Sequence, residues 1–307
     1  MTAERSLSRF TAPRWWPYWL GLGVMRLLAF LPYRVHLALG GGLGALMFRL
    51  LRKRREVAAR NLALCFPERS AGEIAALTRA HFRSLGIAFF EMTLAWWASR
   101  QRLARIMTLQ GFEHLQDVLA DGRGAILVSG HFTTLEISGP ELVRHVETDC
   151  MYRPNRNPFI DEILRRGRER VARRAIRKDD ARAMLRRLRE NGVVWYAPDQ
   201  AYWHKHGALI PFFGIPSWTN TGTSRMAKLS GAPVLPYFCE RLPGAAGYRM
   251  VIGKPLEGFP TDDPVADSAR LNRLFEAQIR AVPEQYLWVH RRFKRLPPPH
   301  DDIYAGL

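Results

Sequence analysis

Two apolar stretches dominate the start of the chain. The first runs from Trp15 to Met25, is interrupted by Arg26 and continues to Leu31, and the second runs from His36 to Phe48. A helix that crosses a bilayer needs about 20 consecutive, mostly apolar residues, and neither stretch supplies them without interruption. The pattern therefore predicts apolar helices but leaves open what covers them.

Charged and aromatic residues around these stretches favour a membrane. Arg5, Arg9 and Arg14 precede the first stretch, whose Trp and Tyr side chains suit the level of the lipid headgroups. A cluster of Arg and Lys side chains at 49–55 follows the second stretch and is expected to face the cytoplasm. We therefore predict that residues 1–55 form a membrane-anchoring segment, either as a tilted single span or as an interfacial helix. The alternative is a helical hairpin buried in a soluble domain.

Residues 56–120 show a helical pattern. Ser70 and Glu73 have the spacing of a capping box, which is typical of the first turn of a helix. Apolar residues then recur at helical spacing, beginning with Ile74 and Leu77. This region is expected to consist mainly of helices.

Beyond residue 120, short apolar runs alternate with helical segments. Five runs resemble strands, at 125–129, 149–152, 193–197, 234–239 and 248–252, and the last two flank a turn rich in Pro and Gly. Residues 179–190 carry a helical pattern that Asn191 and Gly192 end. The alternation predicts an α/β fold with a mixed, mostly parallel sheet flanked by helices, over residues 56–296. Residues 297–307 are expected to be an irregular tail.

Composition narrows the class of partner. The chain has 307 residues, is 47% hydrophobic, and carries 46 Lys and Arg against 28 Asp and Glu, a net charge of +18. Such an excess indicates anionic partners, namely nucleic acid, membrane phosphates, or acidic proteins and substrates. Nucleic acid is disfavoured because the basic stretch at 151–190 has few aromatic side chains. Three widely spaced cysteines indicate a reducing compartment, and no ligand cluster predicts a metal.

The strongest candidate for chemistry follows the apolar run at 125–129. His131 and Glu136 lie five residues apart, about 140° around an unbroken helix, so they meet only if His131 lies on the turn before the helix. A carboxylate on one imidazole nitrogen would fix the tautomer and leave the other nitrogen as a base. Because no Ser or Cys stands at the spacing of a nucleophile, this base would deprotonate a substrate hydroxyl. The structural alternative is a second capping box, formed by Thr133 and Glu136.

Further motifs follow one another along the chain. They are Asn61-Leu62, Cys65-Phe66-Pro67-Glu68, Gly130-His131-Phe132-x-x-Leu135-Glu136, Tyr152-Arg153-Pro154-Asn155, Gly167-Arg168, Val194 to Asp199, Pro211-x-Phe213 and Pro283 to Lys294. With the apolar N-terminus, this ordered set resembles the late, or secondary, lipid A acyltransferases of Gram-negative bacteria, the lauroyl/myristoyl transferase family. The resemblance spans residues 15–296. Glu rather than Asp at position 136 is similar to the lauroyl-type branch.

The resemblance implies an O-acyltransferase that looks like the glycerolipid acyltransferases in fold and works at the cytoplasmic face of the inner membrane. It implies transfer of a fatty acyl chain, lauroyl or similar, from acyl carrier protein to a hydroxyl on an acyl chain of a Kdo-bearing lipid A precursor. The carrier thioester is a co-substrate, and no cofactor is implied. The implied partners are acyl carrier protein, the phosphorylated lipid A precursor and the anionic inner-membrane leaflet. All three are anionic, which accounts for the net charge without nucleic acid.

The resemblance and the spacing together give roles to individual residues. His131 is expected to deprotonate the acceptor hydroxyl and Glu136 to orient it, with backbone N–H groups of a helix after Thr133 stabilising the oxyanion. Arg168 and Asp199 match family positions tied to activity and are expected to contact substrate. Asp199 ends the run at 193–197, and ligands bind beyond the carboxyl ends of parallel strands, so it is expected near His131.

Other basic residues are expected to meet anionic groups. Arg153 follows the run at 149–152 and is expected to contact a headgroup or the carrier protein, or to cap its loop. The basic side chains at 290–295 form either a docking face or a solvated helix end.

Two other activities remain open from the sequence. One is an acyl-carrier-protein-dependent acyltransferase that acts on another membrane glycolipid or on a lysophospholipid. The other is a hydrolase in which the same base activates water.

Overall fold

The centre of the molecule is a seven-stranded sheet with the order β1-β9-β8-β2-β5-β3-β4. The computed structural model describes residues 7–298 and 302–307, so Arg5 lies outside the described residues. The strands of the sheet are β1 (Met107–Gln110), β2 (Ala125–Val128), β3 (Thr148–Tyr152), β4 (Arg174–Arg177), β5 (Val193–Tyr196), β8 (Val234–Arg241) and β9 (Tyr248–Ile252). A separate antiparallel hairpin consists of β6 (Gly207–Phe212) and β7 (Ile215–Asn220).

Five neighbouring strands of the sheet run in one direction. β8, β2, β5, β3 and β4 pair in parallel, whereas β9 is antiparallel to β8, and β1 is parallel to β9. The mostly parallel α/β sheet expected from the sequence is therefore confirmed. The five expected strands are all present, and β8 and β9 form the expected hairpin. The strands β1, β4, β6 and β7 are additional to that expectation.

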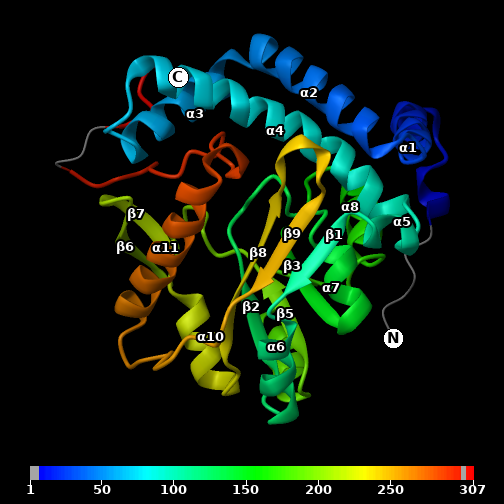
Figure 1. The fold of residues 1–307 in the computed structure, drawn as a ribbon. Coiled ribbons are helices and arrows are strands. Elements are labelled where there is room, and N and C mark those ends of the chain that lie inside the picture. Colours follow the sequence, from blue (N-terminus) through cyan, green and yellow to red (C-terminus); the bar gives the residue numbers. More distant parts are fainter. Residues whose placement is uncertain (1–6, 299–301) are drawn as a thin grey trace.

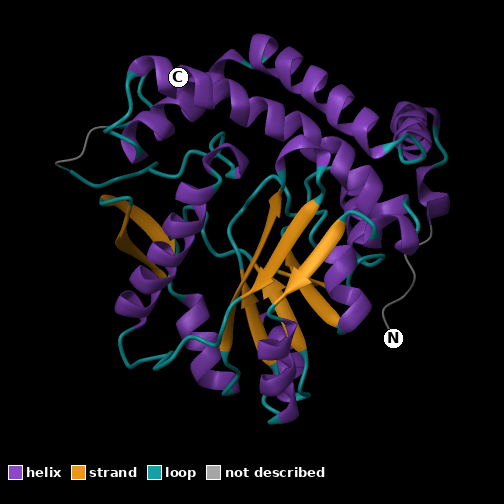
Figure 2. Ribbon diagram, viewed as in Figure 1, coloured by secondary structure: helices purple, strands orange, loops and turns teal. Residues whose placement is uncertain are grey.

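Helices cover the sheet on both sides (Figure 2). They are α1 (Trp16–Leu28), α2 (Tyr33–Leu50), α3 (Arg52–Cys65), α4 (Ala71–Trp97), α5 (Arg100–Ala104), α6 (Phe112–Ala120), α7 (Gly139–His145), α8 (Pro158–Arg168), α9 (Ala181–Arg189), α10 (Gly222–Ser230) and α11 (Pro264–Ala281). The expected helix at 179–190 is α9, and the helical region at 56–120 contains α3 to α6 with β1 between them.

The side chains of β2 enter two different cores. Ile126 and Val128 pack into one core with residues of α3, α9 and α11, whereas Ala125 and Leu127 pack into another with residues of α6, α7 and β9. All four side chains are fully buried. Helices thus cover both faces of this strand, which explains its uninterrupted apolar sequence.

The helix α4 begins at the expected capping box. The Ser70 hydroxyl accepts a hydrogen bond from the backbone N–H of Glu73, and the Glu73 carboxylate accepts one from the backbone N–H of Ser70. From there α4 extends over 27 residues; its first half supplies buried side chains to one core and its last turn to the other. This helix links the N-terminal segment to the sheet.

The helix α2 lies side by side with α4, along the top of the view in Figure 1. Glycines on both helices allow this approach. A Cβ added at Gly86 of α4 would lie 2.2 Å from the carbonyl oxygen of Gly40 and 2.3 Å from the nitrogen of Gly44 on α2. Contact between the two backbones therefore fixes α2 to the α/β part of the chain.

The outer faces of α1 and α2 carry most of the exposed large apolar side chains in the described residues. They are Trp16, Tyr18, Leu20, Val24 and Leu27 on α1, Phe30 between the helices, and Val35, Leu39, Leu46 and Leu50 on α2. We call this set the apolar face. Within residues 7–298 and 302–307, no helix combines the length and the apolar character that a membrane crossing requires.

The close contact between α2 and α4 predicts a sharp difference between two glycine substitutions. Gly86→Ala forces the helices apart and is expected to lower the free energy of unfolding by about 1–3 kcal/mol. Gly42→Ala on α2 is the matched control, because nothing lies within 4 Å of an added Cβ there. It is expected to raise the free energy of unfolding by about 0.5–1 kcal/mol, since Ala favours helix over Gly. Denaturant unfolding of both variants measures this, and equal stabilities would contradict the packing described.

Candidate active site

His131 and Asp199 occupy matching positions at the carboxyl edge of the sheet. In the parallel pair of β2 and β5, Val128 is the partner of Tyr196. His131 follows Val128 by three residues, and Asp199 follows Tyr196 by the same number. The expectation that Asp199 lies near His131 is confirmed by a direct hydrogen bond between their side chains.

The carboxylate of Asp199 contacts both the side chain and the backbone of His131. Its Oδ1 lies 2.6 Å from His131 Nδ1, and its Oδ2 accepts a hydrogen bond of 2.9 Å from the His131 backbone N–H. The Tyr286 hydroxyl donates a further hydrogen bond of 2.8 Å to Oδ2. Three donors therefore surround one carboxylate, two of them from the same residue.

These contacts keep Asp199 ionised although its side chain has no exposure to solvent. Burial by itself raises the pKa of a carboxyl group, but the nearby imidazole and the hydrogen bonds from His131 and Tyr286 lower the pKa of Asp199 to about 2. An ionised carboxylate accepts hydrogen bonds and donates none. The hydrogen between Asp199 and the imidazole therefore belongs to Nδ1 of His131.

The Asp199 contact fixes which imidazole nitrogen is available for chemistry. With a hydrogen on Nδ1, the neutral ring carries its lone pair on Nε2. The His131 side chain is 30% exposed, whereas that of Asp199 is fully buried. The arrangement can therefore accept a proton from a molecule bound at the carboxyl edge of the sheet.

The segment at 285–287 closes the other side of this site. Phe132 and Tyr286 form an isolated antiparallel bridge. The Thr133 N–H donates to the Gln285 carbonyl at 2.7 Å, and the Leu287 N–H donates to the His131 carbonyl at 3.0 Å. A part of the chain close to the C-terminus thus holds the turn that carries His131.

Glu136 does not make the expected contact with the imidazole ring of His131. Asp199 binds the ring instead. The Oε1 atom of Glu136 accepts hydrogen bonds from Arg168 Nε at 3.0 Å and from Arg168 Nη2 at 2.6 Å. The orienting contact with His131 Nδ1, expected from Glu136, is made by Asp199 instead. Burial opposes the charge of Arg168, but Glu136 outweighs it and raises the pKa of the Arg168 guanidinium.

The local backbone explains this correction. Residues 133–138 form successive turns rather than a helix, and α7 begins only at Gly139 after Ser138. The alternative of a capping box at Thr133 and Glu136 is therefore not realised, and the Thr133 N–H bonds to Gln285 instead of facing a ligand. The expectation of oxyanion donors at a helix starting after Thr133 is wrong for the same reason. The turns place Glu136 against Arg168, the last residue of α8.

A small cavity of about 20 Å³ adjoins Glu136 and Arg168. Its walls are mostly apolar and include Leu142, Trp195 and Tyr237. The pair of charged side chains therefore forms the polar part of an otherwise apolar cavity beneath α7.

The basic residues at 290–295 have different surroundings, and none of them is part of a helix. His290 accepts a hydrogen bond from the Ala201 N–H at 3.3 Å, and burial is the main reason that its pKa falls to about 3. Arg292 is buried and donates to the Trp218 carbonyl at 2.6 Å. Both are held within the fold, which contradicts the solvated helix end considered for this stretch.

Lys294 and Arg295 instead cover the ring of Trp203. The Lys294 ammonium lies 4.6 Å from the ring centroid and the Arg295 guanidinium carbon 4.4 Å from it. Burial, Arg295 and Arg153 lower the pKa of Lys294, in that order, so Arg153 lies close to this group. The exposed Arg153 follows β3 at the carboxyl edge of the sheet, where the sequence placed it. We call Arg153, Lys294, Arg295 and Trp203 the cationic cluster.

Buried hydrogen bonds from α4 and β8 support the turn that follows His131. Arg241 binds both carboxylate oxygens of Glu91, at 2.5 and 2.7 Å, and also donates to the Ser84 hydroxyl at 2.8 Å. Ser84 and Thr133 share a hydrogen bond of 2.7 Å. The network therefore connects α4 and β8 to the segment that follows His131.

Sequence reasoning gave no role to two residues that contact the His131 site. Tyr286 binds Asp199, and Gln285 receives the Thr133 N–H. Both lie within the motif from Pro283 to Lys294, so their place in the ordered set of motifs was the available signal. Among the residues that the structure describes, no group of three His, Cys, Asp or Glu side chains is arranged to hold a metal ion.

Known proteins match this chain over almost its whole length. A family model described as bacterial lipid A biosynthesis acyltransferase matches residues 4–295. The lipid A biosynthesis lauroyltransferase of Escherichia coli K12 is 39% identical over 286 residues, which cover 93% of this chain and 94% of the relative. The palmitoleoyltransferase of lipid A biosynthesis from the same strain is 36% identical over 296 residues, 96% of each chain. A lipid A biosynthesis acyltransferase of Haemophilus influenzae is 34% identical over 292 residues, 94% of this chain and 93% of the relative.

Proposed function

The chain belongs to the bacterial lipid A biosynthesis acyltransferase family, and from this premise we propose its reaction in detail. A fatty acyl chain, lauroyl or similar, passes from the thioester of acyl carrier protein to a hydroxyl on an acyl chain of a Kdo-bearing lipid A precursor. Membership of the family makes the protein an O-acyltransferase of lipid A biosynthesis. The observation that carries the detailed proposal is the His131–Asp199 pair, because it leaves His131 Nε2 available to accept a proton.

In the proposed reaction His131 transfers one proton. Nε2 takes the proton of the acceptor hydroxyl while the hydroxyl oxygen attacks the thioester carbonyl carbon. When the carbon–sulfur bond of the tetrahedral intermediate breaks, the imidazolium returns the proton to the leaving thiolate. Asp199 keeps the hydrogen on Nδ1 and stabilises the imidazolium between the two steps. The products are an ester and the free thiol of the carrier, so no proton is gained or lost overall.

Arg168 supplies positive charge beside the reacting carbonyl in this proposal. Its guanidinium is fixed by two hydrogen bonds to Glu136 and lines the small apolar cavity. A fixed cation beside the reacting carbonyl favours the oxyanion of the tetrahedral intermediate. Glu136 is then a positioning residue for Arg168.

The cationic cluster is the proposed place for an anionic group of the acceptor. Lys294 lies close to Arg153, Arg291 and Arg295, and its neighbour His290 lies close to His131 and Asp199. Among the described residues, no salt bridge joins Arg153, Lys294 or Arg295 to a carboxylate. A phosphate or carboxylate of the glycolipid would balance this charge.

The apolar face is the proposed site of attachment to the cytoplasmic side of the inner membrane. Its side chains are exposed to solvent in the isolated chain, Phe30 by 73% and Leu20 by 72%. The basic residues at 49–55 adjoin the end of α2, where anionic lipid headgroups would attract them. With α2 fixed to α4, attachment would bring the carboxyl edge of the sheet close to lipid acceptors.

The proposed reaction predicts a mass change in the acceptor. With lauroyl–acyl carrier protein and a tetra-acylated, Kdo-bearing lipid A precursor, the wild-type protein is expected to add one lauroyl group, as read by mass spectrometry. His131→Ala is expected to lower kcat by about 10²–10⁴-fold, because it removes the base. His145→Ala on α7 is the control and is expected to retain wild-type activity. Transfer to a lysophospholipid but not to the precursor would overturn the acceptor, and full activity of His131→Ala would overturn the base.

The contacts of Glu136 predict a specific pattern of energetic coupling. Glu136→Gln and Arg168→Gln each lower kcat/KM, and the double variant is expected to lose little more than the worse single variant, because the two residues act as one unit. The losses from Glu136→Gln and Asp199→Asn are expected to add. The reverse pattern, in which Glu136 couples to Asp199 and not to Arg168, would return Glu136 to the orienting role expected from the sequence.

The apolar face predicts which surface changes release the protein from lipid. A double variant with Leu20→Asp and Leu27→Asp is expected to bind vesicles of phosphatidylglycerol and phosphatidylethanolamine at least about tenfold more weakly, because two exposed apolar contacts are replaced by negative charge. Leu229→Asp on α10 is the control, since Leu229 is 59% exposed but lies outside this face. Vesicle flotation measures the bound fraction, and equal binding by both variants would contradict the assignment of the face.

A further inference from the structure

A cavity of about 350 Å³ lies between α1, the end of α4 and α8. None of the residues proposed for catalysis lines it, so it is distinct from the site around His131. It is open to solvent along one side, and we call it the α1–α8 groove. Its size is that of a small-molecule site, at the lower end of the range for such sites.

The walls of the α1–α8 groove are largely aromatic. Trp19 comes from α1, and Trp96 and Trp97 come from the last turn of α4. Leu7, Leu22 and Ile163 add apolar side chains to the lining. These walls suit a hydrocarbon chain.

Arginines from two helices and a loop also line the groove. Arg166 is neutralised by Glu162, with a hydrogen bond of 2.7 Å. Neither Arg26 nor Arg170 forms a salt bridge with a carboxylate in the part of the chain that the structure describes, and Arg170 makes only a long contact of 3.5 Å with the Trp96 carbonyl. The groove therefore has an excess of positive charge that an anion would balance.

A buried donor in the same wall lacks an acceptor. Trp96 is 4% exposed, and its indole Nε1–H has no hydrogen-bond partner in the described structure. This N–H is buried behind the surface of the groove, so Trp96 adds an aromatic wall to the groove and no hydrogen bond to a ligand.

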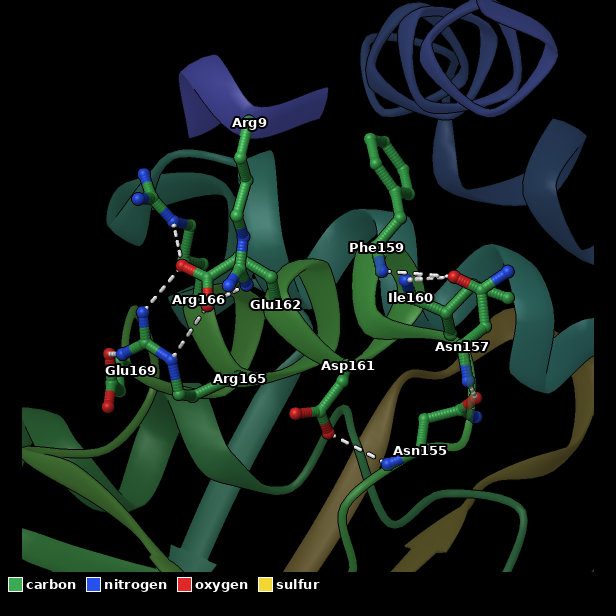
Figure 3. Close-up of polar contacts among 10 residues, drawn as sticks. All are labelled: Arg9, Asn155, Asn157, Phe159, Ile160, Asp161, Glu162, Arg165, Arg166 and Glu169. Atoms are coloured by element: carbon green, nitrogen blue, oxygen red, sulfur yellow. Dashed lines mark hydrogen bonds and ion pairs between the residues drawn. The ribbon is translucent and has the colours of Figure 1, made fainter. Parts of the chain in front are cut away.

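The N-terminal segment holds the groove in shape. Figure 3 shows the buried carboxylate of Glu162 on α8 between Arg165, Arg166 and Arg9, and the Arg9 contact measures 3.9 Å. Phe159 extends from α8 toward the N-terminal helices, where its ring centroid lies 5.1 Å from that of Trp19. The Trp19–Phe159 contact thus holds α1 against α8, and the Arg9–Glu162 contact holds the segment before α1 against the same helix.

The groove is also continuous with the apolar face. Leu22, Gly23 and Arg26 of α1 line the groove, whereas Leu20, Val24 and Leu27 of the same helix are exposed. A molecule that lies in a lipid leaflet under the apolar face can therefore reach the groove along α1.

We propose that the α1–α8 groove binds an anionic glycerophospholipid of the membrane. One acyl chain lies along Trp19 and Trp97, and the phosphate lies between Arg26 and Arg170. The chemistry of the groove requires a hydrocarbon chain and an anion in one molecule, which a free phosphate ion does not supply. This binding site is separate from the proposed acyl transfer and does not depend on it.

The test measures binding of soluble short-chain lipids to the full chain. Dihexanoyl phosphatidylglycerol is expected to bind with one site, and Arg26→Gln and Arg170→Gln are each expected to weaken its affinity about tenfold through loss of a charged contact. Gly23→Leu fills the groove and is expected to abolish binding, since nothing lies within 4 Å of an added Cβ at Gly23 and the variant has room to fold. Arg34→Gln on α2 is the matched control, because Arg34 is exposed and lies outside the groove.

Isothermal titration and native mass spectrometry give the affinity and the number of bound lipids. Equal weakening by Arg34→Gln would show general attraction to a basic surface and overturn the proposal. Equally tight binding of inorganic phosphate, or of dihexanoyl phosphatidylcholine, would overturn the requirement for an anionic lipid. Displacement of the phospholipid by the lipid A precursor, together with a higher precursor KM in Gly23→Leu, would assign the groove to the acceptor instead.

Discussion

The site depends on the buried carboxylate of Asp199 and the three donors around it. A charged group without solvent is costly unless hydrogen bonds replace the water that it loses. Here the His131 ring, the His131 backbone and the Tyr286 hydroxyl take that place. The three groups come from the end of β2 and from a segment near the C-terminus, whereas Asp199 follows β5. One carboxylate therefore joins three distant parts of the chain and at the same time fixes the tautomer of His131.

The helices that lie over the carboxyl edge of the sheet connect this site to the apolar face. α4 contacts the turn after His131 through Ser84 and Thr133, and α2 packs on α4 through glycines. The outer faces of α1 and α2 are apolar. In the proposed function this arrangement places a proton-accepting imidazole close to a membrane surface, where a glycolipid acceptor and a carrier-bound acyl chain both have access. The α1–α8 groove extends the contact with lipid to the other side of α1.

Local patterns in the sequence were sufficient for much of the fold. β2 is a run of apolar residues between Gly124 and Gly130, and the box of Ser70 and Glu73 marks the start of α4. The pattern does not predict β4, because its sequence, Arg-Ala-Ile-Arg, resembles a charged surface. It does not predict β6 and β7 because they contain Pro211 and Pro216, which disfavour strands. The sequence favours Glu136 for the orienting role because helix geometry relates only residues that are close in the chain. The partner of His131 lies 68 residues away, and strand pairing alone brings it there.

The tautomer of His131 tests the central claim most directly. In protein labelled with ¹⁵N-histidine, the His131 signals are identified by their absence in His131→Ala, and NMR shows which ring nitrogen carries hydrogen. For the neutral ring we expect hydrogen on Nδ1 and none on Nε2, and we expect Asp199→Asn to shift the Nδ1 signal while Glu136→Gln leaves it in place. Hydrogen on Nε2, or an Nδ1 signal that responds to Glu136→Gln and not to Asp199→Asn, would contradict the account.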